Sequence, residues 1–148
     1  MARIKVNLPP EGFIFTTEIP LRIGDINYGG HLGHDVFLPI VHEARMRFLA
    51  EMGYSEMNLG GYGIVIAGAT IEYIRESFYG DTIIVNLGVD SFHKCGFDIV
   101  YQLLSKKNNV EIGRVITALV FYDYSVRKVV RVPPQVIQNI NDRRPKQV

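Results

Sequence analysis

The sequence is short of cysteine, of long apolar runs and of excess charge, and each shortage excludes a class of protein. Its single cysteine, Cys95, has no partner for an internal disulfide. The 16 basic and 15 acidic residues leave a formal charge of +1, which provides no electrostatic footprint for nucleic acid or an anionic membrane. With no signal-like or membrane-spanning run, we expect a reduced, cytoplasmic protein that binds neither nucleic acid nor membrane.

Several motifs of hydrolases and metal sites are missing as well. The chain has no G-x-S-x-G, no G-x-x-x-x-G-K-S/T loop and no paired C-x-x-C, so we expect neither a serine hydrolase nor a nucleotide hydrolase. His31, His34, Asp35 and His42 are residue types that bind zinc, but their spacing does not match a known helical zinc motif. We therefore expect no metal site.

The chain does have the composition of a globular domain. It contains 148 residues, of which 47% are hydrophobic and 21% charged. A chain of this length buries about 68–70% of its unfolded surface, which is enough for one core. We find no repeat, low-complexity segment or linker, and expect one domain over residues 1–148, with residues 1–12 as a loose arm.

The stretch from Leu21 to Met46 combines a polar turn with the start of an amphipathic helix. Asp35 is suited to the N-cap, and a helix ending at Gly53 is predicted from apolar residues at intervals of three and four: Phe37, Val41, Ala44, Phe48 and Met52. Pro39 is tolerated only in the first turn of such a helix. A helix start has unpaired N–H groups and the positive end of the dipole, which suit a carbonyl oxygen that gains negative charge.

A period of two predicts strands on both sides of this helix. A first strand is expected over residues 13–22, and five more over residues 64–78, 82–93, 97–105, 110–124 and 129–132. The short connectors predict antiparallel hairpins between consecutive strands, and a short helix is expected after Pro133 and Pro134. The pattern indicates an α+β fold with one helix against a curved sheet. Because one helix covers only part of such a sheet, we expect a homodimer or a dimer of dimers.

Four short motifs follow one another between Arg22 and Pro134. They are DINYGGHLGH at residues 25–34, HEAR at 42–45, YGD at 79–81 and RVP at 131–133. In this order they resemble the hot-dog fold acyl-CoA thioesterases of the 4-hydroxybenzoyl-CoA thioesterase type. The resemblance implies a long central helix wrapped by an antiparallel sheet of about five to six strands. It also implies hydrolysis of an acyl-CoA or acyl-carrier thioester, with coenzyme A as part of the substrate and no separate cofactor.

The resemblance places the family's catalytic aspartate at Asn27, where a carboxamide lacks the basicity of a carboxylate. It also implies that the backbone N–H of His34 polarises the thioester oxygen. We expect Asn27 to position water and His31 to act as base, because an imidazole pKa of about 6.5 suits neutral pH. Asp25 would orient the imidazole ring, and Glu43 is the other candidate base.

Each of these residues also has a structural interpretation. Asn27 can hold an Asx turn, Asp25 can stabilise the same turn, and His31 can close the glycine loop by hydrogen bonding. Glu43, Arg47 and Glu51 follow one another at i, i+4 spacing, where they could form a row of ion pairs on a solvated helix face. The sequence leaves both interpretations open.

Further residues are candidates for substrate contacts. Gly30 allows the loop to fold tightly around a ligand, because glycine adopts backbone conformations closed to other residues. Arg75 and Lys94 are candidates for contacts to the phosphates of coenzyme A. Cys95 lies at a strand junction between Lys94 and Gly96, and we interpret it as a structural thiol.

Three functions are compatible with these residues. Thioester hydrolysis is the leading hypothesis. An enoyl-thioester hydratase of the same fold is the second, since Asp25-x-Asn27 followed by His31 is similar to that family's D-x-N-P-x-H. The third is a non-catalytic acyl-binding subunit, for which asparagine at position 27 is the argument.

Overall fold

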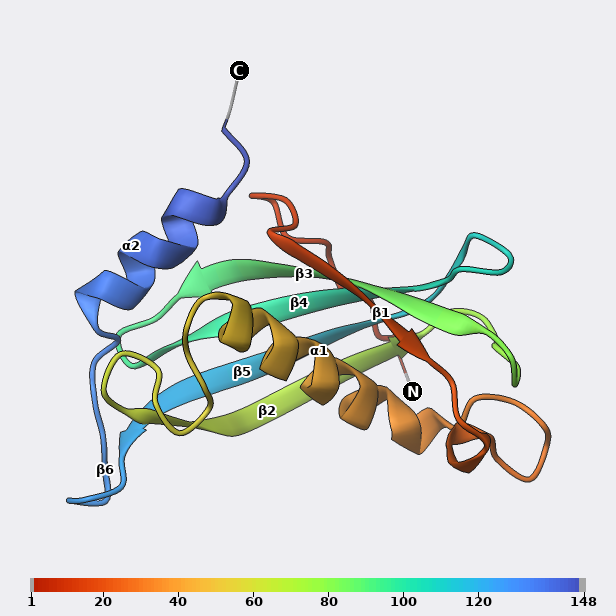
Figure 1. The fold of residues 1–148 in the computed structure, drawn as a ribbon, viewed down its shortest axis with the longest axis horizontal. Coiled ribbons are helices and arrows are strands. Elements are labelled where there is room, and N and C mark those ends of the chain that lie inside the picture. The colour runs from red at the N-terminus through yellow and green to blue at the C-terminus, as the bar shows by residue number, and fades with distance from the viewer. Residues whose placement is uncertain (1, 147–148) are drawn as a thin grey trace.

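The computed structural model describes residues 2–146 and contains one antiparallel sheet with a long helix across it (Figure 1). The strand order is β1-β3-β4-β5-β2, with β6 paired to β5. The elements are β1 (Phe15–Pro20), the 3₁₀ turns η1 (Ile23–Asp25) and η2 (His34–Val36), α1 (Phe37–Glu51), β2 (Gly63–Tyr73), β3 (Thr82–Phe92), β4 (Gly96–Ser105), β5 (Val110–Asp123), β6 (Lys128–Val129) and α2 (Pro134–Arg143).

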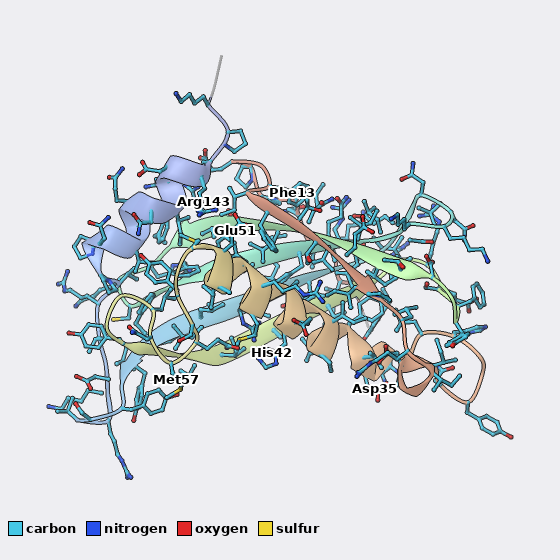
Figure 2. The ribbon with its side chains drawn as sticks, viewed as in Figure 1. Phe13, Asp35, His42, Glu51, Met57 and Arg143 are labelled. Carbon is cyan, nitrogen blue, oxygen red and sulfur yellow. The ribbon has the colours of Figure 1, made fainter. Side chains whose placement is uncertain are left out.

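Helix α1 packs on the sheet through one apolar stripe, as the periodicity predicts. The buried side chains of this stripe are Phe37, Ile40, Val41, Ala44, Phe48 and Leu49. Pro39 lies in the first turn, where its missing N–H is tolerated. Gly53 follows the helix with φ +81°, a left-handed conformation that ends a helix and favours glycine. Figure 2 shows Asp35 at one end of α1 and Glu51 at the other.

The start of α1 differs from the prediction. The helix begins at Phe37 without a side-chain cap, so the prediction that Asp35 is its N-cap is wrong. Asp35 instead lies inside η2, and Gly33 takes the extended conformation that precedes this turn. The extra 3₁₀ turn places the unpaired backbone N–H groups at His34 and Asp35, ahead of the regular helix.

The strand pairing corrects one expected hairpin. The hairpins β3–β4 and β4–β5 are confirmed, but β2 pairs with β5, from Gly63 opposite Tyr122 to Tyr73 opposite Gly113. β3 pairs instead with β1 and β4, so the prediction of a β2–β3 hairpin is wrong. Residues 74–81 therefore form a crossover between non-adjacent strands. Strand alternation reports which face is buried but not which strand lies alongside.

Segments near both ends of the described residues 2–146 are held by the rest of the fold. Val6 is buried, its N–H donates to Glu72 Oε1 (2.8 Å), and its carbonyl accepts a hydrogen bond from Arg114 (2.9 Å). The prediction of a loose arm over residues 1–12 is therefore wrong at Val6. The predicted C-terminal helix is confirmed as α2, which has proline in its first turn. Glu51 does not continue the row of charges on α1 but pairs with Arg143 of α2 (2.6 Å; Figure 2).

Within residues 2–146 we find no helix with the length and apolar character that a membrane crossing needs.

Candidate active site

The loop between η1 and η2 is closed by the side chain of Asn27. Its Oδ1 accepts hydrogen bonds from the N–H groups of Gly29 (3.0 Å) and His31 (3.1 Å). Its backbone N–H donates to the His31 carbonyl (2.7 Å), and Gly30 has the left-handed φ of +84° that this tight loop requires. Asn27 thus takes the Asx-turn arrangement, and its Nδ2 group is the part left for contacts with water or substrate.

The crossover holds the other side of this loop. The N–H of Leu32 donates to the Ser77 carbonyl (2.8 Å), and His31 forms an isolated antiparallel bridge with Phe78. The His31 ring meets the Phe78 ring edge-on, with the centroids 5.2 Å apart. His31 Nδ1 lies 3.3 Å from Glu76 Oε1, and 37% of the His31 side chain is exposed. The crossover therefore both positions the imidazole and supplies its carboxylate neighbour.

Asp25 lies on the other side of the turn. Its Oδ2 accepts a hydrogen bond from the backbone N–H of Arg22 (2.8 Å), and its Oδ1 lies 3.5 Å from the Arg22 guanidinium. Its carbonyl accepts a hydrogen bond from the N–H of Gly33 (3.0 Å). Asp25 is buried and stabilises the turn, and Glu76 rather than Asp25 is the acid next to the His31 ring.

The start of η2 presents unpaired backbone N–H groups. Within residues 2–146, the N–H groups of His34 and Asp35 have no hydrogen-bond partner. The His34 carbonyl accepts a hydrogen bond from the Tyr73 hydroxyl (2.8 Å). Burial, together with the negative charge of Asp35, raises the pKa of Tyr73, so its hydroxyl remains a donor at neutral pH. Tyr73 therefore fixes the His34 peptide from its carbonyl side.

These groups surround a cavity of about 310 Å³, which we call the β2-side cavity. It brings together four of the predicted site residues, namely Asn27, His31, His34 and Arg75. The remaining lining residues are Leu32, Phe37, Tyr73, Ile74, Glu76 and Ser77. Arg75 donates to the Glu111 carbonyl (3.3 Å) and adds a positive charge to the cavity lining.

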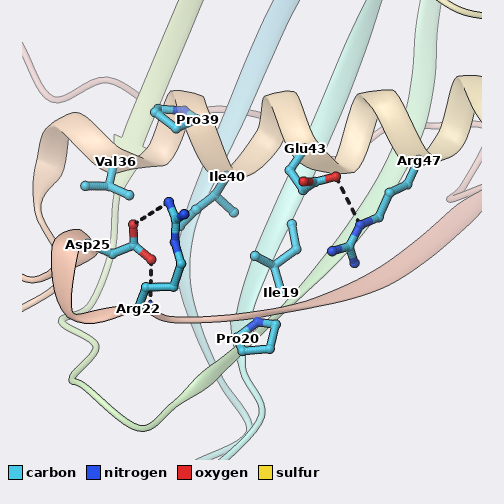
Figure 3. Close-up of a pocket in the computed structure, with 9 residues that line it drawn as sticks. All are labelled: Ile19, Pro20, Arg22, Asp25, Val36, Pro39, Ile40, Glu43 and Arg47. Atoms are coloured by element: carbon cyan, nitrogen blue, oxygen red, sulfur yellow. Dashed lines mark hydrogen bonds and ion pairs between the residues drawn. The ribbon is translucent and has the colours of Figure 1, made fainter.

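A second cavity, of about 350 Å³, lies at the start of α1 on the side of β1 (Figure 3). We call it the β1-side cavity, and it contains the other two predicted acids, Asp25 and Glu43. Glu43 pairs with Arg47 (3.2 Å), which also donates to Thr17 Oγ1 (2.9 Å) and to the Glu18 carbonyl (2.8 Å). Glu43 is thus separated from the imidazole and is already paired, as its structural interpretation predicts.

Lys94 lies at the far end of the sheet from Arg75. Lys94 lies two residues before Gly96, which pairs with Val120 near the end of β5. Tyr73, which lines the β2-side cavity, pairs instead with Gly113 near the start of β5. The Lys94 carbonyl accepts a hydrogen bond from the N–H of Val132 (3.1 Å). One chain therefore does not bring Lys94 and Arg75 to the same cavity.

Tyr73 and Glu76 are the site residues that the sequence does not reveal. Both lie at or beyond the end of β2, and their importance depends on the crossover. The YGD motif at residues 79–81 was the available signal, because Asp81 anchors this segment. Its carboxylate accepts hydrogen bonds from Ser77 (3.0 Å), Ser105, Thr82 N–H (2.8 Å) and Lys107 N–H (3.1 Å). Burial raises the pKa of Asp81, but these hydrogen bonds together outweigh burial and hold the pKa below its usual value.

No group of three or more His, Cys, Asp or Glu side chains suited to a metal ion occurs in the part of the chain that the structure describes. Cys95 is half-buried and its thiol is free. Its backbone carbonyl accepts a hydrogen bond from the N–H of Phe121 (2.7 Å). It lies at the Gly96 end of the strands, away from the β2-side cavity.

One family model matches the part of the chain that contains the long helix, the loop before it and most of the sheet. Residues 21–140 match the Thioesterase-like superfamily, and the chain belongs to this family. The 1,4-dihydroxy-2-naphthoyl-CoA thioesterase Slr0204 from Synechocystis is 25% identical, with a TM-score of 0.77 over 86% of this chain and 96% of that chain. The predicted hot-dog fold is confirmed.

Two further solved structures share this fold at lower identity. A thioesterase from Thermus thermophilus, complexed with coenzyme A and Zn, is 21% identical, with a TM-score of 0.78 over 91% of this chain and 99% of that chain. A thioesterase superfamily protein from Jannaschia sp. CCS1 is 14% identical, with a TM-score of 0.80 over 97% and 96% of the two chains.

Proposed function

We propose that this protein hydrolyses acyl-CoA or acyl-carrier thioesters in the β2-side cavity. The observation that carries the proposal is the unpaired N–H of His34, at the start of a helix and in the lining of the cavity that contains His31. Membership of the Thioesterase-like superfamily supports the reaction class. The cytoplasmic pool of acyl thioesters is the expected source of substrate.

In the proposed reaction the thioester oxygen accepts a hydrogen bond from the His34 N–H. Negative charge develops on this oxygen as water attacks, and the positive end of the helix dipole favours it. One such preorganised donor is typically worth about 3 kcal/mol of transition-state stabilisation. Tyr73 holds the peptide in place, because its hydroxyl bonds to the carbonyl of the same residue.

His31 is the proposed base, and Glu76 stabilises its protonated form. Nδ1 faces the Glu76 carboxylate, so Nε2 is the nitrogen available to take a proton from water. The water oxygen bonds to the acyl carbon, the carbon–sulfur bond breaks, and the proton passes from Nε2 to the departing thiolate. Asn27 Nδ2 would hold the water, and Arg75 would contact a phosphate of the coenzyme.

A homodimer through the outer edge of β2 is part of the proposal. Within residues 2–146 β2 pairs only with β5, and its segment from Ile66 to Thr70 is exposed. An edge strand of this length is normally covered in a folded protein. Light scattering should therefore give at least twice the mass of one chain, and a monomer across the working concentrations would contradict this part.

The main test is a panel of acyl-CoA and acyl-carrier thioesters with a thiol-trapping readout. We expect the wild-type protein to release free thiol and the Asn27→Asp variant to release it more slowly. Aspartate keeps the acceptor for the two loop N–H groups but lacks the donor that would hold water. Absence of thiol release from every substrate would refute the hydrolase.

A non-catalytic acyl-binding subunit is the second candidate. It is favoured by one observation: both hydrogen bonds at Asn27 Oδ1 go to the loop itself, so this oxygen does not activate water. This candidate predicts saturable binding without turnover, and a gain of activity in Asn27→Asp. Loss of enoyl absorbance without thiol release would instead identify a hydratase.

A further inference from the structure

A row of polar side chains crosses the face of the sheet that points away from α1, and we call it the outer row. The strand register places its members opposite one another on β3, β4, β5 and β2: Asn86, Gln102, Arg114 and Glu72. Successive residues of a strand point to opposite faces of the sheet. Tyr73 directly follows Glu72, and its ring packs on the α1 side against Phe37.

Hydrogen bonds connect the outer row from one strand to the next. Asn86 Nδ2 donates to Gln102 Oε1 (3.1 Å), and Gln102 Nε2 donates to Glu111 Oε2 (2.9 Å). Arg114 donates to both carboxylate oxygens of Glu111 (2.8 and 3.0 Å). These hydrogen bonds, and then the negative charges of Glu111 and Glu72, raise the pKa of Arg114 against the opposing effect of burial. The row therefore ends in a firmly held cation opposite Glu72.

The N-terminal segment from Val6 to Pro9, which we call the strap, crosses the same face of the sheet. The N–H of Val6 donates to Glu72 Oε1 (2.8 Å), and its carbonyl accepts a hydrogen bond from Arg114 (2.9 Å). Pro9 fills the space in front of Gly88 on β3, where a Cβ would lie 2.6 Å from Pro9 Cγ. The strap thus runs from β2 to β3, and Glu72 is its anchor on β2.

The end of β2 has little other support within the chain. Within residues 2–146 β2 pairs only with β5, and the exposed segment 66–70, assigned above to a second copy, stops short of Tyr73. The neighbour of Tyr73 on β5 is Gly113, where a Cβ would lie 2.5 Å from Phe37. The ends of edge strands open readily unless other contacts hold them. Glu72 supplies such contacts from the outer face.

We propose that Glu72 is a positioning residue for the β2-side cavity. It anchors the end of β2 to the strap, and the anchored strand holds the Tyr73 hydroxyl against the His34 carbonyl (2.8 Å). Glu72 acts through Tyr73 and does not contact the substrate. This inference rests on the proposed function, because it assumes that the N–H of His34 binds the thioester oxygen.

The test replaces the carboxylate of Glu72 in the full-length protein and measures thiol release. Glu72→Met keeps the length of the side chain but removes the acceptor for the Val6 N–H. We expect kcat to fall by about three- to tenfold with little change in KM, because the His34 peptide is less firmly oriented in the transition state. Glu72→Gln keeps an oxygen that can accept this hydrogen bond, and should keep most of the wild-type kcat.

The matched control is Glu18→Met on the other edge strand, β1. Glu18 also has a partner, Lys106 at 2.7 Å, but it is not connected to Tyr73. We expect this variant to keep the wild-type kcat. If kcat also falls there, loss of an acid at either edge of the sheet affects turnover, and the specific role of Glu72 is refuted.

Combination with Tyr73→Phe distinguishes positioning from general stabilisation. If Glu72 acts through the Tyr73 hydroxyl, the double variant should be no slower than the slower single variant. Losses of kcat that multiply would show that the two residues act independently. A purely structural Glu72 would lower the free energy of unfolding in urea but leave kcat and KM of the folded protein unchanged.

Two results would overturn the inference: an unchanged kcat in Glu72→Met, or losses that multiply in the double variant. If Glu72→Met does not fold, Val6→Ala weakens the strap from its other side, and an unchanged kcat there would overturn the inference as well. If no thioester is hydrolysed, the NMR shift of the His34 carbonyl carbon decides. A shift in Glu72→Met toward its value in Tyr73→Phe would support the positioning role while the hydrolase fails, and no shift would overturn both.

Discussion

The two cavities beside the start of α1 differ in how far their polar groups are already paired within the chain. In the β1-side cavity Asp25 is bound to Arg22, and Glu43 to Arg47 (Figure 3). In the β2-side cavity the N–H of His34 has no partner within residues 2–146, and the His31 ring is 37% exposed.

The difference shows that acid groups in a cavity do not by themselves indicate chemistry. A carboxylate whose oxygens are taken by neighbouring donors has little capacity left for a substrate, and its role is to hold the chain. A donor without a partner, fixed at a helix start, is ready for an oxygen that gains charge. Activity is therefore expected on the β2 side of α1, and stability on the β1 side.

The largest expected effect comes from replacing each of the two candidate bases, His31 and Glu43, by glutamine in separate variants. His31→Gln should lower kcat by about 10²-fold, because it removes the group that we propose accepts a proton from water. Glu43→Gln, the matched change in the β1-side cavity, should stay within about twofold, since it loses only a partly exposed ion pair with Arg47. Thiol release with both variants measures the difference, and equal losses would remove the distinction between the cavities.

An intermediate effect is expected at Asp81. Its carboxylate accepts a hydrogen bond from Ser77, which lines the β2-side cavity. Its depressed pKa means that the folded state is stabilised above the unfolded pKa of about 3.9 and loses this contribution as pH falls through the lower folded value. Asp81→Asn should lower the free energy of unfolding at pH 7 by about 1–3 kcal/mol and flatten its fall below pH 4.

Urea unfolding from pH 3 to pH 7 would measure the effect at Asp81. Asp142→Asn is the control, because Asp142 is exposed on α2 and accepts one hydrogen bond, from Gln138. If both variants follow the same pH dependence, the hydrogen bonds at Asp81 do not contribute the expected acid sensitivity.

The smallest expected effect is at Tyr73. Tyr73→Phe removes the hydrogen bond to the His34 carbonyl and leaves the ring against Phe37 in place. We expect kcat to fall by about three- to tenfold with little change in KM, because the His34 peptide is less firmly oriented in the transition state. Steady-state kinetics separates the two constants. A change confined to KM would mean that Tyr73 contacts substrate instead of positioning the peptide.

Local pattern predicts the elements of this fold well. The stripe on α1 and the proline start of α2 are read correctly, because helix periodicity and proline geometry depend on neighbouring residues. The partner of β2 is not predicted, because any antiparallel neighbour satisfies the same alternation. The cap of α1 is misplaced because Asp35 has the residue type of a cap but lies inside a 3₁₀ turn.

The candidate site is predicted only in part, for a related reason. Asn27, His31 and His34 fall in one cavity because one short loop carries them. Asp25 belongs to the same loop, but its side chain points to the opposite side of α1, a direction that spacing does not reveal. Glu76 comes from the crossover, so its place next to the imidazole depends on the strand order.

The crossover also bears on the order in which the protein becomes functional. The bridge between His31 and Phe78 joins segments that are distant along the chain, whereas β3, β4 and β5 are joined by short turns. Contacts of large sequence separation form late, because the entropy of closing the intervening chain must be lost first. On refolding from denaturant, most of the sheet signal should return before turnover does, and the imidazole should be among the last groups to reach its place.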